Sequence, residues 1–95
     1  MSQLTITENA VAGLERCRLF LASKNKLASK RAAQTISHHF KLLQNDPKIG
    51  RPLDDYPALR ELIIPFGSSG YTALYRSEKN KIFILSFKHQ KEVYG

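Results

Sequence analysis

The carboxyl-terminal string from Phe87 to Gly95 holds the residues best suited to acid–base chemistry. His89 has lysines close by on both sides, and their positive charge favours its neutral form, so it could act as a base near neutral pH. Tyr94 could donate or accept a proton, and Lys88 and Lys91 could stabilise the negative charge that develops in phosphoryl transfer. The alternative is an exposed polar tail without chemistry, which is common at the ends of chains.

Two arginines on neighbouring predicted strands could add phosphate contacts. Arg60 and Arg76 can aim their guanidinium groups at the same edge of a sheet, and arginine suits bidentate phosphate binding. Each of them also has a carboxylate nearby along the chain, Glu61 or Glu78, and a plain ion pair is the alternative.

The other reactive residue types give no site. His38 and His39 are adjacent on a predicted helix and point about 100° apart, so they cannot share a metal ion as an i, i+4 pair can. Cys17 lies on an apolar stripe and is expected to be a small buried hydrophobe, and Asp54 and Asp55 are expected to belong to a turn. The sequence has no glycine-rich phosphate loop and no serine nucleophile elbow. It therefore predicts neither a metal nor a cofactor.

The chain is strongly basic: its 95 residues carry 15 Lys and Arg against 8 Asp and Glu, a formal charge of +7. Such a balance favours anionic partners such as nucleic acid or an acidic protein. No acidic residue occurs from Arg16 to Lys41, where the basic residues are Arg16, Arg18, Lys24, Lys26, Lys30, Arg31 and Lys41. This stretch predicts either a solvated helical face or a docking site for phosphates or an acidic polypeptide.

Length and cysteine content limit the architecture. Residues 1–95 are expected to form one domain, because single cores typically need about 50 to 200 residues. Cys17 is the single cysteine, so no disulfide can form within the chain and a reducing compartment is expected. The amino terminus lacks a signal-peptide pattern and no apolar run approaches about 18 residues. The sequence therefore predicts a cytoplasmic protein that does not enter a membrane.

The first half of the chain predicts a short strand and a helical hairpin. Residues 3–7 alternate apolar and polar side chains, as a strand with one buried face does. A capping-box spacing of Thr5 and Glu8, or a cap at Thr7, begins a helix, and the run 23–26 separates it from a second helix. The apolar stripes of the two helices are Val11, Leu14, Cys17 and Leu21, then Ala28, Ala32, Ile36, Phe40 and Leu43.

The second half predicts a three-stranded antiparallel meander after a proline-rich surface connection over 48–57. The expected strands are 59–64, 71–76 and 81–87, and the expected turns are 65–70 and 77–80. The run 82–87 is apolar on both alternating faces, which indicates a strand covered on both sides or at the centre of the sheet. The whole pattern predicts an α+β domain in which an antiparallel helical hairpin packs on a mostly antiparallel sheet of about four strands.

Four segments together resemble the RelE/ParE superfamily of toxin–antitoxin toxins, also described as plasmid stabilisation proteins. They are DPKIGRPLDD after the second helix, LRELIIPF, GYTALYR and the terminal IFILSFKHQKEVYG. The resemblance spans nearly the whole chain and includes the order of strand, helical hairpin and meander. The GRP loop, LREL and the GYTALYR strand resemble members of the ParE branch more closely than those of the RelE branch.

The resemblance implies a bacterial growth inhibitor that a co-expressed antitoxin neutralises. The extended and often acidic carboxyl-terminal segment of such an antitoxin wraps the helices and sheet of the toxin, which suits the +7 charge. Folding of a disordered segment on the toxin would also stabilise a small domain. The residues expected to bind the antitoxin are Arg16, Arg18, Lys24, Lys30, Arg31 and Lys41.

The resemblance leaves two kinds of target. Members of the RelE branch are ribosome-dependent ribonucleases that cut messenger RNA by attack of a ribose 2′-hydroxyl, while the ParE branch poisons DNA gyrase without a hydrolytic site. The residues implied as catalytic in a ribonuclease are Arg60, Lys88, His89 and Tyr94. The residues expected to contact either target are Arg51, Arg60, Arg76, Lys88, His89 and Lys91.

Two departures from the RelE pattern favour gyrase inhibition over RNA cleavage. The lysine-rich catalytic segment of the RelE branch is not reproduced between residues 48 and 58, and Gln90 replaces the aromatic residue that some ribonucleases place directly after the histidine. A decayed toxin that only binds its antitoxin and a generic basic nucleic-acid-binding domain are the remaining alternatives.

Overall fold

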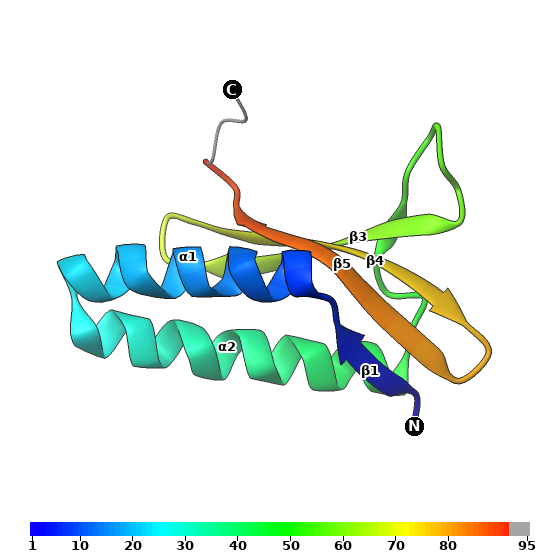
Figure 1. The fold of residues 1–95 in the computed structure, drawn as a ribbon, viewed down its shortest axis with the longest axis horizontal. Helices are drawn as coiled ribbons and strands as arrows, with labels where there is room; N and C mark the ends of the chain where they lie inside the picture. The colour runs from blue at the N-terminus through cyan, green and yellow to red at the C-terminus, as the bar shows by residue number, and fades with distance from the viewer. Residues whose placement is uncertain (92–95) are drawn as a thin grey trace.

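Two helices pack on one five-stranded sheet in the computed structural model, which describes residues 1–91 (Figure 1). In chain order the elements are β1 (Gln3–Ile6), α1 (Glu8–Lys24), α2 (Lys26–Asn45), β2 (Arg51–Pro52), β3 (Leu59–Phe66), β4 (Ser69–Glu78) and β5 (Lys81–His89). The order across the sheet is β1-β5-β4-β3-β2, with β1 parallel to β5 and every other pair antiparallel. The predicted α+β fold is confirmed.

The sheet has five strands where about four were predicted, and the additional one is the short edge strand β2. Arg51 pairs with Glu61 and Pro52 pairs with Arg60, within the segment expected to be a surface crossing. Two residues, one of them a proline without an N–H, carry too little pattern to be recognised as a strand.

The helical hairpin turns on a single residue, Asn25. Its backbone N–H donates to the carbonyl of Leu21 at the end of α1 (2.8 Å), and its side-chain oxygen accepts the N–H of Ala28 at the start of α2 (3.1 Å). The predicted separator at 23–26 is therefore helical except for Asn25. At the other end of α1, Thr7 is the N-cap, the second of the two caps that the sequence allowed.

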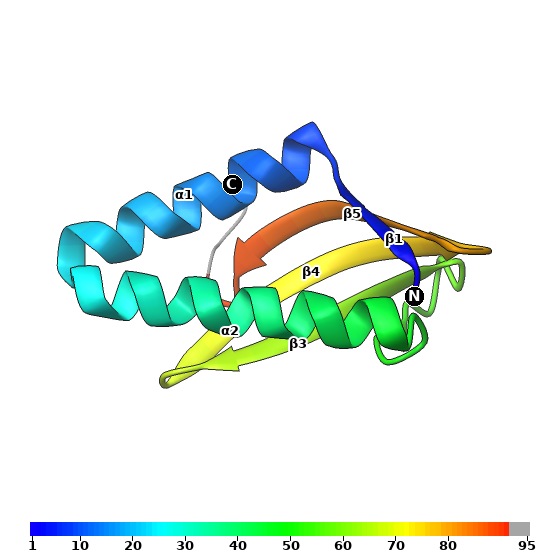
Figure 2. The same cartoon turned by 90° about the horizontal axis from the view of Figure 1, so that it is seen from below.

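Both helices cover the same face of the sheet, and the core lies between them and that face (Figure 2). The largest fully buried side chains are Leu43, Ile64, Tyr75, Ile82, Ile84 and Phe87. β5 lies between β1 and β4, as the central-strand alternative predicted, but Phe83 on its other face is only half-buried. No helix within residues 1–91 is long and apolar enough to span a bilayer.

Helix α1 lies directly against the backbone of β5 at Gly13. A Cβ atom there would lie 2.0 Å from the carbonyl oxygen of Phe87, much closer than side chains come to backbone. One turn earlier, the side-chain Nδ2 of Asn9 donates to the carbonyl of Leu85 (2.9 Å). These contacts seat α1 against the last third of β5, where the predicted chemistry was expected.

Candidate functional site

The residues implied as catalytic lie apart in the structure. Arg60 pairs in register with Tyr75, and His89 pairs with Tyr71, four residues away along the same strand β4, which corresponds to about 13 Å. Lys88 neighbours His89 on β5, so the pleat sends its side chain to the opposite face of the sheet. Tyr94 lies outside the described residues. The described members of the set therefore do not meet at one point.

Arg60 is engaged in holding the connection between α2 and β3. Its Nη1 donates to the carbonyl oxygens of Lys48 (3.2 Å) and Gly50 (2.7 Å). Next to it, the hydroxyl of Tyr75 donates to the carbonyl of Pro47 (2.7 Å) and accepts the N–H of Gly50 (2.9 Å). Burial raises the pKa of Tyr75 above its ordinary value, so the phenol stays protonated and able to donate. Arg60 and Tyr75 together fix the path of residues 47–50.

The other arginines expected to contact a target form ion pairs at the surface. Arg51 pairs with Glu61 (3.2 Å), and Arg76 pairs with Glu78 (3.0 Å) and lies over the ring of Phe83 (5.5 Å). The alternative that the sequence raised, a plain ion pair, therefore holds for Arg76, while Glu61 pairs with Arg51 and not with Arg60.

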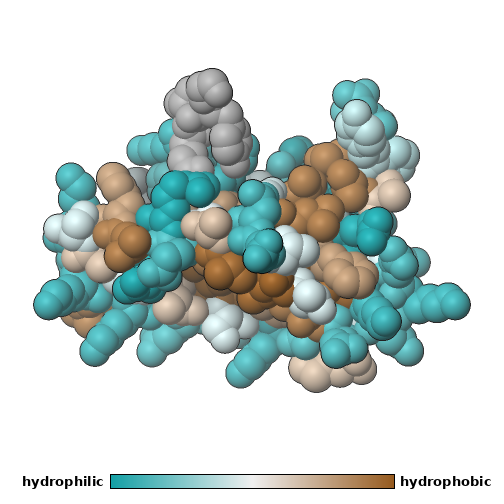
Figure 3. Space-filling view, in the orientation of Figure 1, coloured by the Kyte–Doolittle hydropathy of each residue, from teal (hydrophilic) through white to brown (hydrophobic). Residues whose placement is uncertain are grey.

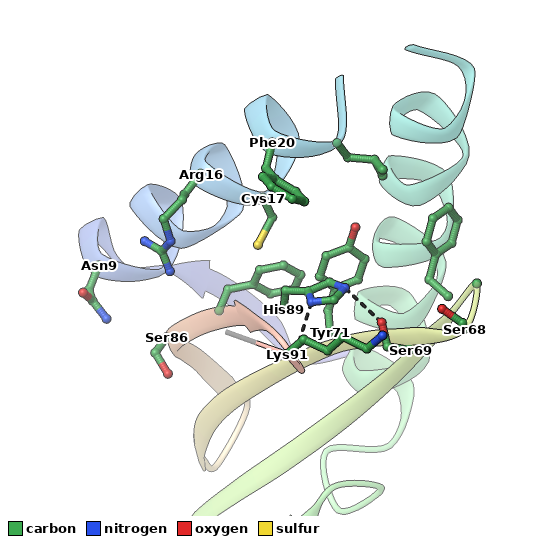
Figure 4. Close-up of a pocket in the computed structure, with 14 residues that line it drawn as sticks. Asn9, Arg16, Cys17, Phe20, Ser68, Ser69, Tyr71, Ser86, His89 and Lys91 are labelled. Atoms are coloured by element: carbon green, nitrogen blue, oxygen red, sulfur yellow. Dashed lines mark hydrogen bonds between the residues drawn. The ribbon is translucent and has the colours of Figure 1, made fainter. Parts of the chain in front are cut away.

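A pocket with a volume of about 920 Å³ lies between α1 and the ends of β4 and β5 (Figure 4). Arg16, Cys17 and Phe20 extend into it from α1. From the sheet it is lined by Ser69, Tyr71, Ser86, Phe87, His89 and Lys91, and from the β3–β4 turn by Phe66, Gly67 and Ser68. Three basic side chains thus border a pocket with an apolar floor.

His89 is held by both of its ring nitrogens in this pocket. Nδ1 accepts the backbone N–H of Lys91 (3.1 Å), and Nε2 lies 3.0 Å from the hydroxyl oxygen of Ser69 (Figure 4). Because Nδ1 is an acceptor, the neutral ring carries its hydrogen on Nε2 and donates it to Ser69. The edge of the ring also contacts Tyr71, with 5.5 Å between ring centroids. The geometry favours a structural role for His89 over the predicted role of a base.

A second hollow, of about 480 Å³, is a groove between α1 and α2. Its apolar lining includes Val11, Leu14, Leu21, Ala33 and Ile36. Its rim carries Lys41 from α2 and, from α1, Arg18 paired with Glu15. Val11 was predicted to face the core, but it is 51% exposed because it faces this groove. The groove offers apolar surface with mostly basic edges.

Within residues 1–91, no three His, Cys, Asp or Glu side chains gather where they could hold a metal ion. The Nδ1 of His39 lies 2.8 Å from the carbonyl of Thr35 in its own helix, and Cys17 is buried.

Comparison with known proteins identifies the family. Residues 4–94 match the family described as ParE toxin of type II toxin-antitoxin system, parDE. The chain belongs to the ParE toxin family. It is similar to a solved structure described as the chromosomal ParDE TA system from P. aeruginosa, at 25% sequence identity and a TM-score of 0.74, over 94% of this chain and 96% of that one. No curated protein matches it. The resemblance to the ParE branch is thereby confirmed.

The basic residues expected to bind an antitoxin point in several directions on this ParE-family fold. Arg16 borders the pocket, Arg18 and Lys41 border the groove, and Lys30 and Arg31 are exposed on α2. Lys24 lies over the ring of Phe20, with 5.6 Å from its Nζ to the ring centroid. The charge pattern alone could not separate these surfaces, because it does not fix the rotation of each helix.

Several residues of the two hollows were missed by sequence reasoning. They are Phe20, Ser69 and Tyr71 in the pocket, and Ala33 in the groove. The sequence did indicate that Phe20 lies outside the core, because Phe20 is not on the apolar stripe of α1. In the structure its side chain is 65% exposed. The other residues carried no such indication, because a serine in a turn, a strand tyrosine and a helix alanine are common structural residues in proteins of any fold.

Proposed function

We propose that this chain is the toxin of a type II toxin–antitoxin pair, which inhibits bacterial growth by poisoning DNA gyrase in the cytoplasm and is neutralised by a cognate antitoxin. The match of residues 4–94 to the ParE toxin family carries the proposal. The similar structure from P. aeruginosa is described as a ParDE toxin–antitoxin system, which supports an antitoxin partner for this chain as well.

The groove between α1 and α2 supports the antitoxin part of the proposal. Its lining supplies apolar surface for the side chains of an amphipathic segment, and Arg18 and Lys41 on its rim suit carboxylates beside those side chains. An antitoxin segment seated there would bury Val11 and the neighbouring apolar surface, so binding would also stabilise the toxin.

The hydrogen bonds that Arg60 and His89 make within the chain support gyrase over RNA as the target. A ribonuclease of the RelE kind needs a phosphate-binding arginine and a basic group near the same reacting atoms. In this chain Arg60 binds backbone carbonyls at one end of the sheet and His89 binds Ser69 and Lys91 at the other. A poison that acts by binding gyrase requires no such constellation.

The test is expression of the chain alone and together with the neighbouring gene in its operon. We expect growth inhibition and induction of the DNA-damage response from the chain alone, and rescue by the neighbour. Purified chain should inhibit supercoiling by gyrase in the absence of ribosomes. Cleavage of messenger RNA on ribosomes with supercoiling unaffected would assign the chain to the ribonuclease alternative. Antitoxin binding without either activity would identify a decayed toxin.

A further inference from the structure

The solvent-exposed side of α2 carries positive charge without any acidic residue. Lys26, Lys30, Arg31 and Lys41 are all exposed, and none of the helix's 20 residues is an Asp or Glu. Within residues 1–91, no carboxylate lies within ion-pair distance of any of the four. In Figure 3, hydrophilic side chains extend from the edge of the molecule formed by the helices. These charges are therefore available to an external anion.

Three of these four basic residues form a row along the helix axis. Lys26, Lys30 and Lys41 are spaced by 4 and 11 residues, which places them within about 60° of one another around a helix of 3.6 residues per turn. At 1.5 Å per residue, the row is about 22 Å long. The exposed polar residues Gln34 and Ser37 fall on the same side between the second and third lysines. We call these five residues the α2 row.

The composition of the α2 row favours phosphates over an acidic peptide. Every member carries an N–H or O–H donor, and none offers an apolar anchor. An acidic peptide needs apolar contacts for affinity, and on this fold the groove supplies them. Ser37 and Lys41 also line that groove, whereas Lys26, Lys30 and Gln34 do not. The exposed leucines of α2, Leu27 and Leu42, lie near the two ends of the helix and off the row. Lysine, serine and glutamine side chains are typical contacts to the nucleic-acid backbone.

We propose that the α2 row binds the phosphate backbone of duplex DNA without reading its sequence. This inference goes beyond the proposed function, which requires contact with gyrase and an antitoxin only. Duplex DNA suits the row better than duplex RNA, because the major groove of B-form DNA is about as wide as a helix, whereas that of A-form RNA is too narrow to admit one. Lysines that bind phosphates release counterions, so the affinity depends steeply on salt concentration.

The test compares two triple variants of the full chain that lose equal charge. Lys26→Gln, Lys30→Gln and Lys41→Gln together remove the charges of the row, and Lys48→Gln, Lys79→Gln and Lys81→Gln together are the matched control at exposed positions outside α2. Binding to a short fluorescent DNA duplex of mixed sequence is followed by anisotropy across a salt series. We expect the row variant to reduce the slope of log K against log salt by about 2 to 3 and the affinity at least about tenfold, and the control to change both much less.

Three outcomes would overturn the proposal. They are equal losses in the two variants, absence of binding by the wild-type chain at about 50 mM salt, and binding of duplex RNA or poly-glutamate as tight as that of DNA. Circular dichroism before the titration checks that both variants are folded. The row variant also separates DNA binding from the proposed inhibition of gyrase, because supercoiling assays contain plasmid DNA. If the variant loses DNA binding but still inhibits supercoiling, the inhibition depends on contact with gyrase.

Discussion

The guanidinium of Arg60 donates a 2.7 Å hydrogen bond to the carbonyl oxygen of Gly50, ten positions earlier in the chain. The same nitrogen reaches Lys48, so one side chain satisfies two carbonyls of a connection that has little regular structure of its own. Arg60, for which the sequence suggested phosphate binding, thus binds backbone carbonyls of its own chain.

Replacing Arg60 with Ala should therefore destabilise the fold. We expect a loss of about 1 to 3 kcal/mol in the free energy of unfolding, because two carbonyls lose a charged donor, whereas Arg31→Ala on the exposed side of α2 should change it by less than about 0.5 kcal/mol. Urea denaturation measures both. Growth inhibition by the Arg60 variant should follow its folded fraction. A variant as stable as wild type but without toxicity would instead indicate that Arg60 contacts the target.

Tyr75→Phe tests the second anchor of the connection. It removes the hydroxyl that bonds Pro47 and Gly50, and we expect a loss of about 1 to 3 kcal/mol at neutral pH. The raised pKa of Tyr75 means that wild type keeps this stability below about pH 10, the ordinary tyrosine value, and loses it as pH rises further toward the folded-state value. The melting temperatures of wild type and Tyr75→Phe should therefore converge as the pH rises from neutral to alkaline. Tyr56→Phe at an exposed position is the control, and a constant gap across pH would contradict the assignment.

His89→Phe separates positioning from proton transfer. The variant keeps a ring against Tyr71 but loses both hydrogen bonds, so the amide of Lys91 should exchange with solvent faster, as measured by hydrogen exchange. Ser69→Ala removes only the Nε2 partner and should leave that amide protected. The role of a base belongs to the ribonuclease alternative, so we expect no cleavage of messenger RNA on ribosomes by either wild type or variant. Cleavage by wild type that the folded variant loses would restore His89 as a base.

Gly13→Ala probes the close contact between α1 and β5. The added methyl would meet the carbonyl of Phe87 at 2.0 Å, and neither backbone can move without disturbing the core. We expect a loss of about 3 kcal/mol or more, at the upper end of what overpacking costs, and poor soluble expression. Ala12→Gly next to it should cost only the helix-propensity difference of about 0.5 to 1 kcal/mol. A stable Gly13 variant in urea unfolding would mean that α1 can shift outward freely.

The elements of the fold could be predicted because each one carries a local periodic signal. Leu4 and Ile6 alternate with polar residues in β1, and Phe40 and Leu43 recur at helical spacing in α2. Two features were not predicted, because they depend on contacts between elements and not on a periodic pattern within one element. Asn25 ends one helix and begins the next, which the polar run around it concealed. The strand β2 exists only because β3 pairs with it.

The candidate site was less predictable than the fold for three physical reasons. The carboxyl-terminal basic residues are neighbours in the sequence, but the pleat of β5 places the side chains of Lys88 and His89 on opposite faces of the sheet. Arg60 binds backbone carbonyl groups, and because every residue has one, the residue types in the sequence do not indicate which carbonyls an arginine will bind. The groove depends on how far α1 and α2 diverge, so Val11, an apolar residue on an apolar stripe, could not be distinguished from core.

Ala33→Glu tests the groove as the antitoxin site. Ala33 is an exposed helix residue that lines the groove, whereas Ala12 is also an exposed alanine, on α1, that does not line it. A glutamate at position 33 would place a charge against apolar contacts and repel an acidic segment, so we expect antitoxin affinity to fall at least about tenfold, or about 1.4 kcal/mol. Ala12→Glu carries the same charge and should bind normally in calorimetry. Because neither change touches the sheet, both variants should still inhibit growth when expressed alone, and co-expressed antitoxin should rescue only the Ala12 variant. Equal rescue of both would place the antitoxin elsewhere on the toxin.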